Sequence, residues 1–364
     1  MNIAIVHDWL TEFAGAEKVV LEMLKVYPNA KIYTSIFDKE KVKEFSSFDV
    51  RTTYLQNIPF SKKFRRLMIP LMPMAFEQLD LSGFDVVISS TTSAAKGVIT
   101  KPRTCHICYC NTPTRYLWEP SLDSRASNSW LKRKINHNLR IWDSVAAERV
   151  DYFIANSKYI AKRIRKYYHR DSKVIYPPVD LDFYKQKNEV KKGEYFLFVS
   201  RLVPYKRADL AIMAFNDLGL ELRIIGGGSE EKKLKKIAKK NIKFLGRASD
   251  VVLRKNIKEA KAVIFPAEED FGIVPVEAMA SGTPVIAYGA GGAQETVIEG
   301  VTGEFFRPQM KEALIEVVKN FDPKKYKVSE MRTQAEKFSA ENFRRNLKKA
   351  VESFCFEYKN TMNL

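Results

Sequence analysis

At 364 residues the chain is longer than a single hydrophobic core usually supports, so its length predicts two domains. A hydrophobic content of 45% with 29% charged residues is ordinary for a soluble globular protein. No apolar stretch reaches the ~18–20 residues that a membrane-spanning helix needs, and the start MNIAIVHDW lacks the basic region and cleavage site of a signal peptide. These features predict a cytoplasmic protein.

The charge balance is strongly basic. The net charge is +18 and the isoelectric point is about 9.5. Residues 1–175 hold roughly 28 Lys and Arg against roughly 17 Asp and Glu, so the surplus lies towards the amino-terminal half. Such a surplus indicates an anionic partner (nucleotide phosphates, an acidic membrane face or nucleic acid) or simply a solvated basic surface. Interleaved aromatic stacking motifs and a recognisable reading helix are missing, which argues against nucleic acid.

The first half alternates apolar runs with amphipathic segments, the pattern of a parallel sheet covered by helices. The first unit consists of the strand 3–7, the loop DWLTEFAGA and a helix from about Glu17 to Tyr27. Gly15, just ahead of that helix, is a candidate phosphate contact. The further expected strands are KIYTSIF, FDVVISS, TCHICYC and DYFIANS, and the helix YIAKRIRKYYH follows them.

The sequence around residues 174–194 interrupts this rhythm with paired prolines and a charged, polar tail, which predicts a linker. Its D-x-D pair, Asp180 and Asp182, is interpreted as turn or helix-cap chemistry rather than a metal site. The alternation then restarts, so we expect an α/β fold of two doubly wound domains, residues 1–173 and 195–341. The expected strands of the second domain are EYFLFVSRL, LRIIGGG, IKFLG, AVIFPA and PVIAYGAGG, with helices from about residue 309 to the end.

Three of the four cysteines lie in CHICYC, which invites a metal interpretation. Cys105 and Cys108 would point to opposite faces of a strand, however, and no second Cys/His pair at zinc-ligand spacing follows. We therefore expect reduced thiols in the core and no metal.

Two cations follow a strand in SRLVPYKR. Arg201 stands at the expected strand end, and Lys206 lies five residues later, before a helix. A guanidinium that binds two oxygens and an ammonium that acts as a point charge can together grip a diphosphate. The pair predicts a phosphate site.

The stretch AEEDFGIVPVEAMASG follows another expected strand. Gly272 allows close backbone approach to a ligand, and a helix that begins near Val274 or Pro275 would present free N–H groups there. Glu277 would lie in the first turn of that helix, where it could accept hydrogen bonds from a ribose or sugar hydroxyl. Glu269, at the strand end, would face the same ligand. The glycines of LRIIGGG predict a tight turn near the nucleotide, and Gly291 and Gly292 could line a sugar pocket.

With these residues in view, the chain resembles the retaining glycosyltransferases of family four, including the bacterial polysaccharide and O-antigen mannosyltransferases. Its most specific marker is the E-x7-E motif, matched by Glu269 and Glu277, and SRLVPYKR, FIANSKYIAKRI, IYPPVD and AGAEK also match. The resemblance spans nearly the whole chain. It implies the GT-B fold, in which two Rossmann-like domains face each other across the active site and a last helix, about 342–364 here, packs back on the first domain.

The resemblance also implies roles for these residues. Arg201 and Lys206 would hold the donor diphosphate and stabilise charge on it, Glu277 the ribose, and Glu269 the donor sugar at the reaction centre. Backbone N–H groups near Phe271, Gly272 and Ile273 would assist. Members of the family commonly need no metal, and the leaving phosphate itself is thought to help take the acceptor proton.

The segment YCNTPTRYLWE, residues 109–119, resembles an acceptor-side motif of polysaccharide mannosyltransferases, in which histidine is usual where this chain has Asn111. Asparagine keeps a hydrogen bond but cannot accept and release a proton as histidine does, which argues against a catalytic role at this position. Asn111, Arg115 and Trp118 are the acceptor candidates. His106, earlier on the strand, is not expected to substitute.

The resemblance and the motifs together favour transfer of a hexose, mannose from GDP-mannose, to a glycan or lipid-linked glycan at the inner membrane face. The mixed basic and apolar run SKKFRRLMIPLMP (61–73) is typical of a peripheral contact with an anionic membrane. The alternatives are a UDP-sugar donor, because no residue identifies the base, and a sugar-nucleotide-binding protein without activity, because of Asn111.

Overall fold

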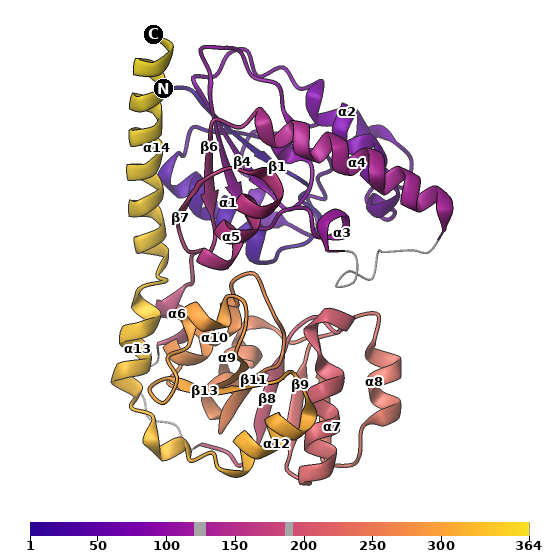
Figure 1. Ribbon diagram of the computed structural model, residues 1–364, viewed down its shortest axis with the longest axis vertical. Helices are drawn as coiled ribbons and strands as arrows, with labels where there is room; N and C mark the ends of the chain where they lie inside the picture. The colour runs from indigo at the N-terminus through magenta and orange to yellow at the C-terminus, as the bar shows by residue number, and fades with distance from the viewer. Residues whose placement is uncertain (120–128, 186–191, 364) are drawn as a thin grey trace. The chain divides into compact units, whose positions relative to one another are not determined.

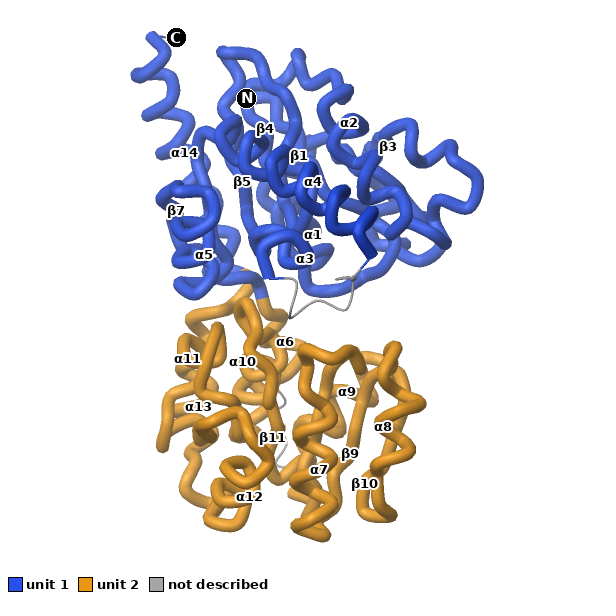
Figure 2. The backbone as a smooth tube through the Cα atoms, turned by 45° about the vertical axis from the view of Figure 1, so that its right-hand side comes forward, with its two compact units in different colours: residues 1–178, 341–364 blue, residues 179–340 orange. Residues whose placement is uncertain are grey.

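The computed structural model describes residues 1–119, 129–185 and 192–363. The chain divides into two compact units (Figure 2): unit 1 contains residues 1–178 and 341–364, and unit 2 contains residues 179–340. The linker predicted at residues 174–194 is partly structured, because Val174 ends a strand of unit 1 and Leu181–Tyr184 forms the helix α6 of unit 2. Asp180 caps α6 by accepting a hydrogen bond from the Phe183 N–H at 3.1 Å, which confirms the capping interpretation.

Unit 1 is built on a parallel sheet of seven strands in the order β3-β2-β1-β4-β5-β6-β7 (Figure 1). The strands are β1 (Ile3–His7), β2 (Lys31–Thr34), β3 (Val50–Thr52), β4 (Val86–Thr91), β5 (Cys105–Cys110), β6 (Tyr152–Ala155) and β7 (Ser172–Val174). The α-helices are α1 (Gly15–Val26), α2 (Met72–Glu77), α3 (Arg115–Trp118), α4 (Trp130–Glu148), α5 (Lys158–Tyr168) and α14 (Ala340–Met362). Short 3₁₀ helices are η1 (Lys43–Phe45), η2 (Tyr54–Asn57), η3 (Arg65–Leu71) and η4 (Ala95–Gly97).

Both faces of this sheet are buried, which is why its strands read as continuous apolar runs. Successive residues of β1 show the alternation: Ile5 packs with α1 and α14, whereas Ala4 packs with α2 and α4. Cys105 and Cys108 likewise belong to different core clusters, and all four cysteines are free and buried, as expected. The last helix, α14, adds Phe343, Leu347 and Val351 to the core of unit 1.

Unit 2 repeats the architecture with a parallel sheet of six strands in the order β10-β9-β8-β11-β12-β13. The strands are β8 (Phe196–Val199), β9 (Leu222–Ile225), β10 (Ile242–Gly246), β11 (Ala262–Phe265), β12 (Val285–Tyr288) and β13 (Gly303–Phe306). Besides α6, the helices are α7 (Ala208–Leu218), α8 (Glu231–Ile237), α9 (Asp250–Glu259), α10 (Ile273–Ala280), α11 (Ala293–Thr296), α12 (Lys311–Lys319) and α13 (Val328–Glu336), with 3₁₀ turns η6 (Pro204–Lys206) and η7 (Pro323–Lys325).

The strands that sequence reasoning missed are β3, β7 and β13, and each lies at an edge of its sheet. Edge strands are short and partly solvent-exposed, so VRT, SKV and GEFF carry no long apolar run to reveal them. The prediction that PVIAYGAGG is the last strong strand holds for the apolar pattern, but β13 follows it. The helix α4 was also not anticipated.

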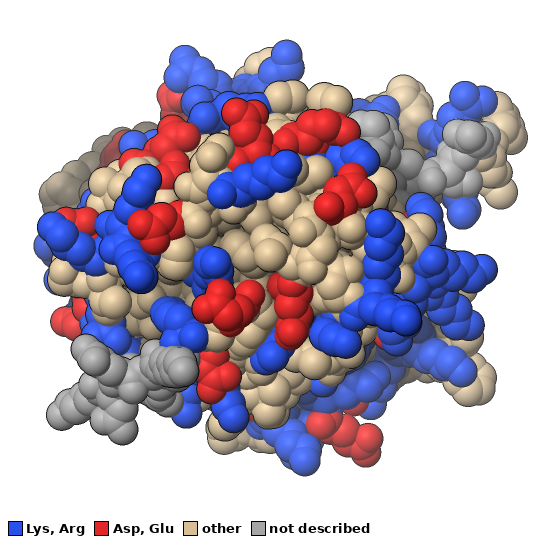
Figure 3. Space-filling model, turned by 90° about the horizontal axis from the view of Figure 1, so that it is seen from below, with Lys and Arg blue, Asp and Glu red and all other residues tan. Residues whose placement is uncertain are grey.

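The basic surplus is concentrated in unit 1, which holds 33 Lys and Arg against 20 Asp and Glu, whereas unit 2 holds 28 against 23. In the view of Figure 3, Lys and Arg side chains stand among Asp and Glu over much of the surface, and a denser group of cations lies along one side. Most of the protein's net charge of +18 is therefore carried by the unit that holds the amino-terminal strands.

Candidate functional site

The strand order of unit 2 brings two of the predicted loops together. From β8 the chain moves outward to β9 and β10, and from β11 it moves the opposite way to β12 and β13, so the direction reverses between β8 and β11. All these strands are parallel, and ligands of such sheets bind at the carboxyl ends where the order reverses. Arg201 and Lys206 follow β8, and Glu269–Ile273 follow β11.

An ion pair joins the two loops directly. The Lys206 ammonium contacts the Glu269 carboxylate, and their side chains are only 11% and 17% exposed. Arg201 is exposed and donates a hydrogen bond of 2.9 Å to the Tyr205 hydroxyl, while the Lys206 Nζ lies 5.1 Å from the centre of the Tyr205 ring. Tyr205, which sequence reasoning did not single out, therefore contacts both cations.

The helix after β11 begins earlier than predicted. Gly272 is its N-cap, with a φ of 87° that only glycine adopts easily, and α10 starts at Ile273. The side chain of Phe271 is buried against Phe338, with 5.3 Å between ring centres, so only its backbone is available to a ligand. The N–H groups of the first turn of α10 lack acceptors within the helix, which makes this end electropositive.

The placement of Glu277 in the first helical turn is wrong. Because α10 starts at Ile273, Glu277 is its fifth residue and lies in the second turn. Its side chain is buried, with 5% of the residue exposed, and it accepts a hydrogen bond from the Tyr184 hydroxyl of α6. Burial, and then the Glu277 charge, raise the pKa of Tyr184, which keeps the phenol protonated as a donor.

Glycines hold both loops from the neighbouring strand ends. A Cβ at Gly226 or Gly228, after β9, would overlap the carbonyl oxygens of Ser200 and Leu202, which flank Arg201. Gly292, after β12, donates from its N–H to the Glu269 carbonyl at 2.8 Å, and a Cβ at this position would overlap the backbone of Phe271. These glycines therefore permit close backbone packing, and the expectation that Gly291 and Gly292 line a sugar pocket stays a prediction.

In unit 1, polar residues gather at the carboxyl ends of β1, β4 and β5. The Asn111 amide donates to the Ser90 hydroxyl at 3.2 Å, and the Nδ1 of His7 lies 2.9 Å from the Ser90 carbonyl oxygen. The other ring nitrogen of His7 lies 3.5 Å from Glu17 in α1. Burial lowers the pKa of His7, but the hydrogen bond and charge of Glu17, with Asp8 and the Ser90 carbonyl, outweigh burial and leave that pKa raised above 6.5.

Sequence reasoning missed His7, Asp8 and Glu17. The buried Asp8 carboxylate accepts hydrogen bonds from the backbone N–H groups of Ala94 and Ala95, both at 2.8 Å, and so ties β1 to the loop after β4. Glu17 accepts from the Ala14 N–H at 2.9 Å and orders the start of α1, where Gly15 is the first residue. The signal was present, because His-Asp directly follows the apolar run IAIV.

A buried carboxylate organises the predicted acceptor segment. Asp143 of α4 pairs with Lys96, and both side chains are 1% exposed. Asp143 also accepts hydrogen bonds from the Thr114 hydroxyl at 2.7 Å and from the Trp118 indole at 2.8 Å. The Trp118 ring stacks on Tyr167, and Arg115 is 9% exposed. Asn111, Arg115 and Trp118 are therefore held within the packing of unit 1, and their acceptor role stays a prediction.

Potential metal ligands were compared across the residues that the structure describes. Within the described residues, no three His, Cys, Asp or Glu side chains come together to hold a metal ion. His106 is buried beside the Ser89 hydroxyl at 2.9 Å, and burial lowers the pKa of its imidazole to about 4. A neutral, enclosed histidine agrees with the expectation that His106 does not replace the usual histidine at position 111.

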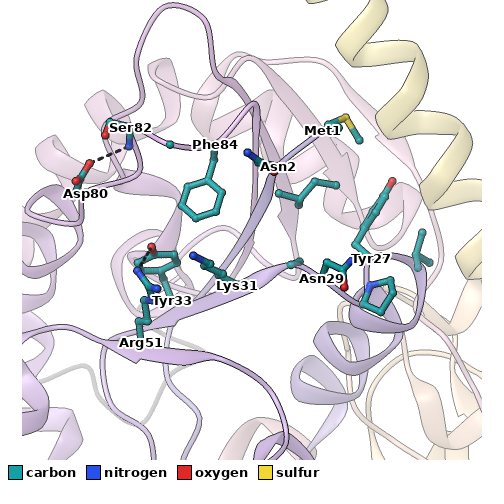
Figure 4. Close-up of a pocket in the computed structure, with 15 residues that line it drawn as sticks. Met1, Asn2, Tyr27, Asn29, Lys31, Tyr33, Arg51, Asp80, Ser82 and Phe84 are labelled. Atoms are coloured by element: carbon teal, nitrogen blue, oxygen red, sulfur yellow. Dashed lines mark hydrogen bonds between the residues drawn. The ribbon is translucent and has the colours of Figure 1, made fainter.

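A pocket of about 590 Å³ opens in unit 1 at the amino-terminal ends of the strands, opposite their carboxyl ends (Figure 4). Met1, Asn2, Lys31, Tyr33 and Arg51 lie around it, near the amino ends of β1 and β2. His7 and Asn111 lie at the opposite, carboxyl ends of the parallel strands β1 and β5, so this pocket is separate from them.

Comparison with known proteins agrees with this architecture. A family model described as glycosyltransferase family 4 matches residues 13–183, and one described as glycosyl transferases group 1 matches residues 180–338. The two matches meet where unit 1 gives way to unit 2. The chain is a GT-B glycosyltransferase of the family 4 type.

Relatives of this glycosyltransferase match from about two-thirds to nearly all of its length. An uncharacterised glycosyltransferase of Methanocaldococcus jannaschii is 25% identical over 97% of this chain and 98% of its own. The mouse alpha-1,3/1,6-mannosyltransferase ALG2 is 28% identical over 65% of each chain. The HepE protein of Anabaena, solved in complex with UDP-glucose, has the same fold, with a TM-score of 0.72 and 21% identity over 97% of this chain and 100% of that one.

The glycosyltransferase has no helix, among the residues that the structure describes, with the length and apolar character needed to cross a bilayer.

Proposed function

We propose that this enzyme transfers a hexose, mannose from GDP-mannose, to a glycan or lipid-linked glycan of a cell-surface polysaccharide with retention of the anomeric configuration. The observation that carries the proposal is the Lys206–Glu269 ion pair, which joins the loops after β8 and β11 where the strand order reverses. A cation for the diphosphate and a carboxylate for the sugar are thereby brought to one point.

The donor side of the reaction belongs to unit 2. Arg201 and Lys206 bind the two phosphates, and the free N–H groups at the start of α10 assist them. Glu269 contacts the donor sugar, and Glu277, oriented by Tyr184, accepts hydrogen bonds from the ribose. Gly15 of unit 1 is a further phosphate contact.

In this reaction the protein stabilises the charge that develops on the leaving diphosphate and does not supply a basic side chain. The bond between the anomeric carbon and the leaving phosphate oxygen breaks, and the acceptor oxygen bonds to that carbon on the same face. The acceptor proton passes to the leaving phosphate. Arg201 and Lys206 stabilise the charge that develops on the diphosphate, and no metal or other cofactor is required.

Asn111, Arg115 and Trp118 form the acceptor side in unit 1, and the acceptor lipid places the enzyme at the inner membrane face. Because the Asn111 amide does not titrate, it positions the acceptor or the sugar and takes no part in proton transfer. The mannosyl donor is supported by the similarity to ALG2, an alpha-1,3/1,6-mannosyltransferase. A UDP-sugar is the second candidate, favoured by the fold shared with a protein solved in complex with UDP-glucose.

A panel of GDP- and UDP-sugars tests the proposal. Mass spectrometry should show nucleoside diphosphate released from GDP-mannose in preference to the other donors, and NMR of the product should show the donor's anomeric configuration. Arg201→Ala and Lys206→Ala each remove charge-assisted hydrogen bonds worth about 1.5–3 kcal/mol, so kcat/KM should fall roughly 10- to 150-fold.

Lys311→Ala is the matched control. Lys311 pairs with Asp217 on the surface of unit 2, so its removal should leave kcat/KM unchanged. Release of UDP instead of GDP would select the second donor, and unchanged turnover in both cation variants would refute the assigned diphosphate site. Donor binding in calorimetry with no product from any acceptor would indicate a protein that binds sugar nucleotides without catalysis.

A further inference from the structure

An exposed apolar surface with interspersed cations lies on unit 1 along residues 60–74. Its apolar members and their exposed fractions are Phe60 74%, Phe64 48%, Leu67 69%, Leu71 39% and Met74 48%. Lys62, Lys63 and Arg66 stand exposed between them. Single exposed apolar residues are common, but five within one short segment form a patch of the kind that marks an interaction site.

Residues 60–74 are packed onto the core of unit 1. Ile69 and Met72 are buried beneath it, in the same core cluster as Leu139 of α4. Figures 1 and 2 both show α2 and α4 on one side of unit 1. The exposed apolar side chains are therefore held outward by packing on the opposite side of η3 and α2.

The first turn of α4 has the same character. Trp130 and Leu131 are 68% and 58% exposed, and the three residues that follow are Lys132, Arg133 and Lys134. The Lys134 Nζ lies 5.4 Å from the centre of the Trp130 ring. Tryptophan beside lysine and arginine is the composition that anchors proteins at the boundary between lipid headgroups and acyl chains.

Two further observations suggest that this surface has a purpose. Phe60 has a φ of 61°, a left-handed conformation that is costly for a bulky residue and that is often retained at functional positions. Arg65 connects the segment to the loop after β1, because it donates to the Thr11 hydroxyl at 2.6 Å and pairs with Glu12 at 2.9 Å. The patch is thereby fixed beside the carboxyl edge of the unit 1 sheet.

The charge pattern selects among partners. Neither residues 50–76 nor residues 124–142 contain an aspartate or glutamate. Nucleic acid would be bound by the cations, and single strands also stack on Phe and Trp, but neither form uses exposed Leu and Met side chains. An anionic bilayer uses both, because its headgroups attract the cations while its hydrocarbon takes up the apolar side chains.

We propose that residues 60–74 and the first turn of α4, here called the docking surface, bind a bilayer that contains anionic phospholipid. This inference rests on the proposed function for the biological reason to dock. A lipid-linked acceptor in the bilayer would lie beside the carboxyl ends of the strands of unit 1. The binding itself requires no sugar transfer.

Flotation of the full-length protein with vesicles tests the inference without any donor or acceptor. Vesicles of phosphatidylcholine alone are compared with vesicles in which one-third of the lipid is phosphatidylglycerol, and the protein should bind the anionic vesicles far better. Neutralisation of three cations in Lys62→Gln/Lys63→Gln/Arg66→Gln should weaken that binding roughly 100-fold, about fivefold for each cation. Phe64→Ser/Leu67→Ser should also weaken binding to the anionic vesicles. The binding that remains at high salt should be lower than for the unmodified protein.

Matched controls lie on unit 2. Lys232→Gln/Lys236→Gln/Lys240→Gln removes the same number of exposed cations, and Val251→Ser/Val252→Ser removes exposed apolar groups. Both controls should bind vesicles like the unmodified protein. Because all substituted side chains are exposed, each variant should also keep the melting temperature of the unmodified protein.

The results that overturn the inference are distinct from those that overturn the proposed function. Equal indifference to both vesicle types, or equal losses in the docking-surface and control variants, would refute membrane docking. A change in sedimentation of the Phe64→Ser/Leu67→Ser variant with unaltered vesicle binding would assign the surface to contact between copies of the chain. In either case release of nucleoside diphosphate from the donor would be unaffected, because Arg201 and Lys206 lie in unit 2.

Discussion

The buried Lys96–Asp143 pair yields the sharpest energetic prediction. Both side chains are 1% exposed, and the Asp143 carboxylate also accepts hydrogen bonds from Thr114, Trp118 and Tyr168. Removing one partner of a buried ion pair leaves an uncompensated charge and typically costs about 3–5 kcal/mol. Lys96→Met and Asp143→Asn should each destabilise unit 1 by that amount.

The double variant should cost much less than the sum of the two single variants. With methionine at 96 and asparagine at 143 no charge remains buried. The asparagine oxygen can still accept from Trp118 and Tyr168, and its amide nitrogen can donate to the Thr114 hydroxyl. We expect a coupling free energy of at least about 2 kcal/mol in the double-mutant cycle, because the two groups are in direct contact.

Tryptophan fluorescence in urea provides the assay. All four tryptophans of the chain (Trp9, Trp118, Trp130 and Trp142) belong to unit 1, so the signal follows the unfolding of that unit alone. Asp171→Asn, which breaks an exposed pair with Arg165, is the control and should leave the midpoint unchanged. Additive costs, with a coupling below about 0.5 kcal/mol, would refute the reasoning.

Four further results are expected. Gly292→Ala should lower kcat/KM at least tenfold, because its Cβ would displace the backbone of Phe271 beside Glu269, whereas Gly300→Ala, with no atom within 4 Å, should cost about 1 kcal/mol of stability and no activity. Tyr184→Phe should raise KM for the donor roughly 3- to 10-fold, because Glu277 loses the hydrogen bond that orients it, and kcat should change little. Because the pKa of His7 is raised, its pair with Glu17 stabilises unit 1 fully below pH 6.5 and less as the pH rises through the folded-state pKa; His7→Gln should abolish that dependence of the urea midpoint. Turnover should be the same with and without EDTA, and a loss restored by Mg²⁺ or Mn²⁺ would contradict the metal-free mechanism.

Several features of the candidate site were accessible from sequence because their chemistry is local. Arg201, Lys206 and Glu269 are polar residues placed directly after apolar runs, and strand ends of parallel sheets are where such residues serve ligands. Gly272 was recognisable as a glycine just ahead of a helix, but only the structure shows that it is the N-cap. The start of α10 was misjudged by one or two residues, which moved Glu277 from the first turn to the second.

Other features depend on contacts between residues far apart in the chain. Glu277 meets Tyr184 across 93 positions, and Asn111 reaches Ser90 and, through it, His7 near the start of the chain. The sequence pattern of each segment contains no information on its partner, so neither contact could be predicted. The same holds for Gly292, which lets the backbone of Glu269 and Phe271 pack closely against the loop after β12.

The alternation of buried strands and amphipathic helices, which is a property of short segments, was sufficient to predict two α/β domains of parallel strands, and the motifs at strand ends pointed to a glycosyltransferase. The order of the strands within each sheet was decided only by tertiary packing, because every buried strand has a similar apolar surface and pairing energy does not depend on the loops it carries. That order places β8 beside β11, and with it Lys206 against Glu269.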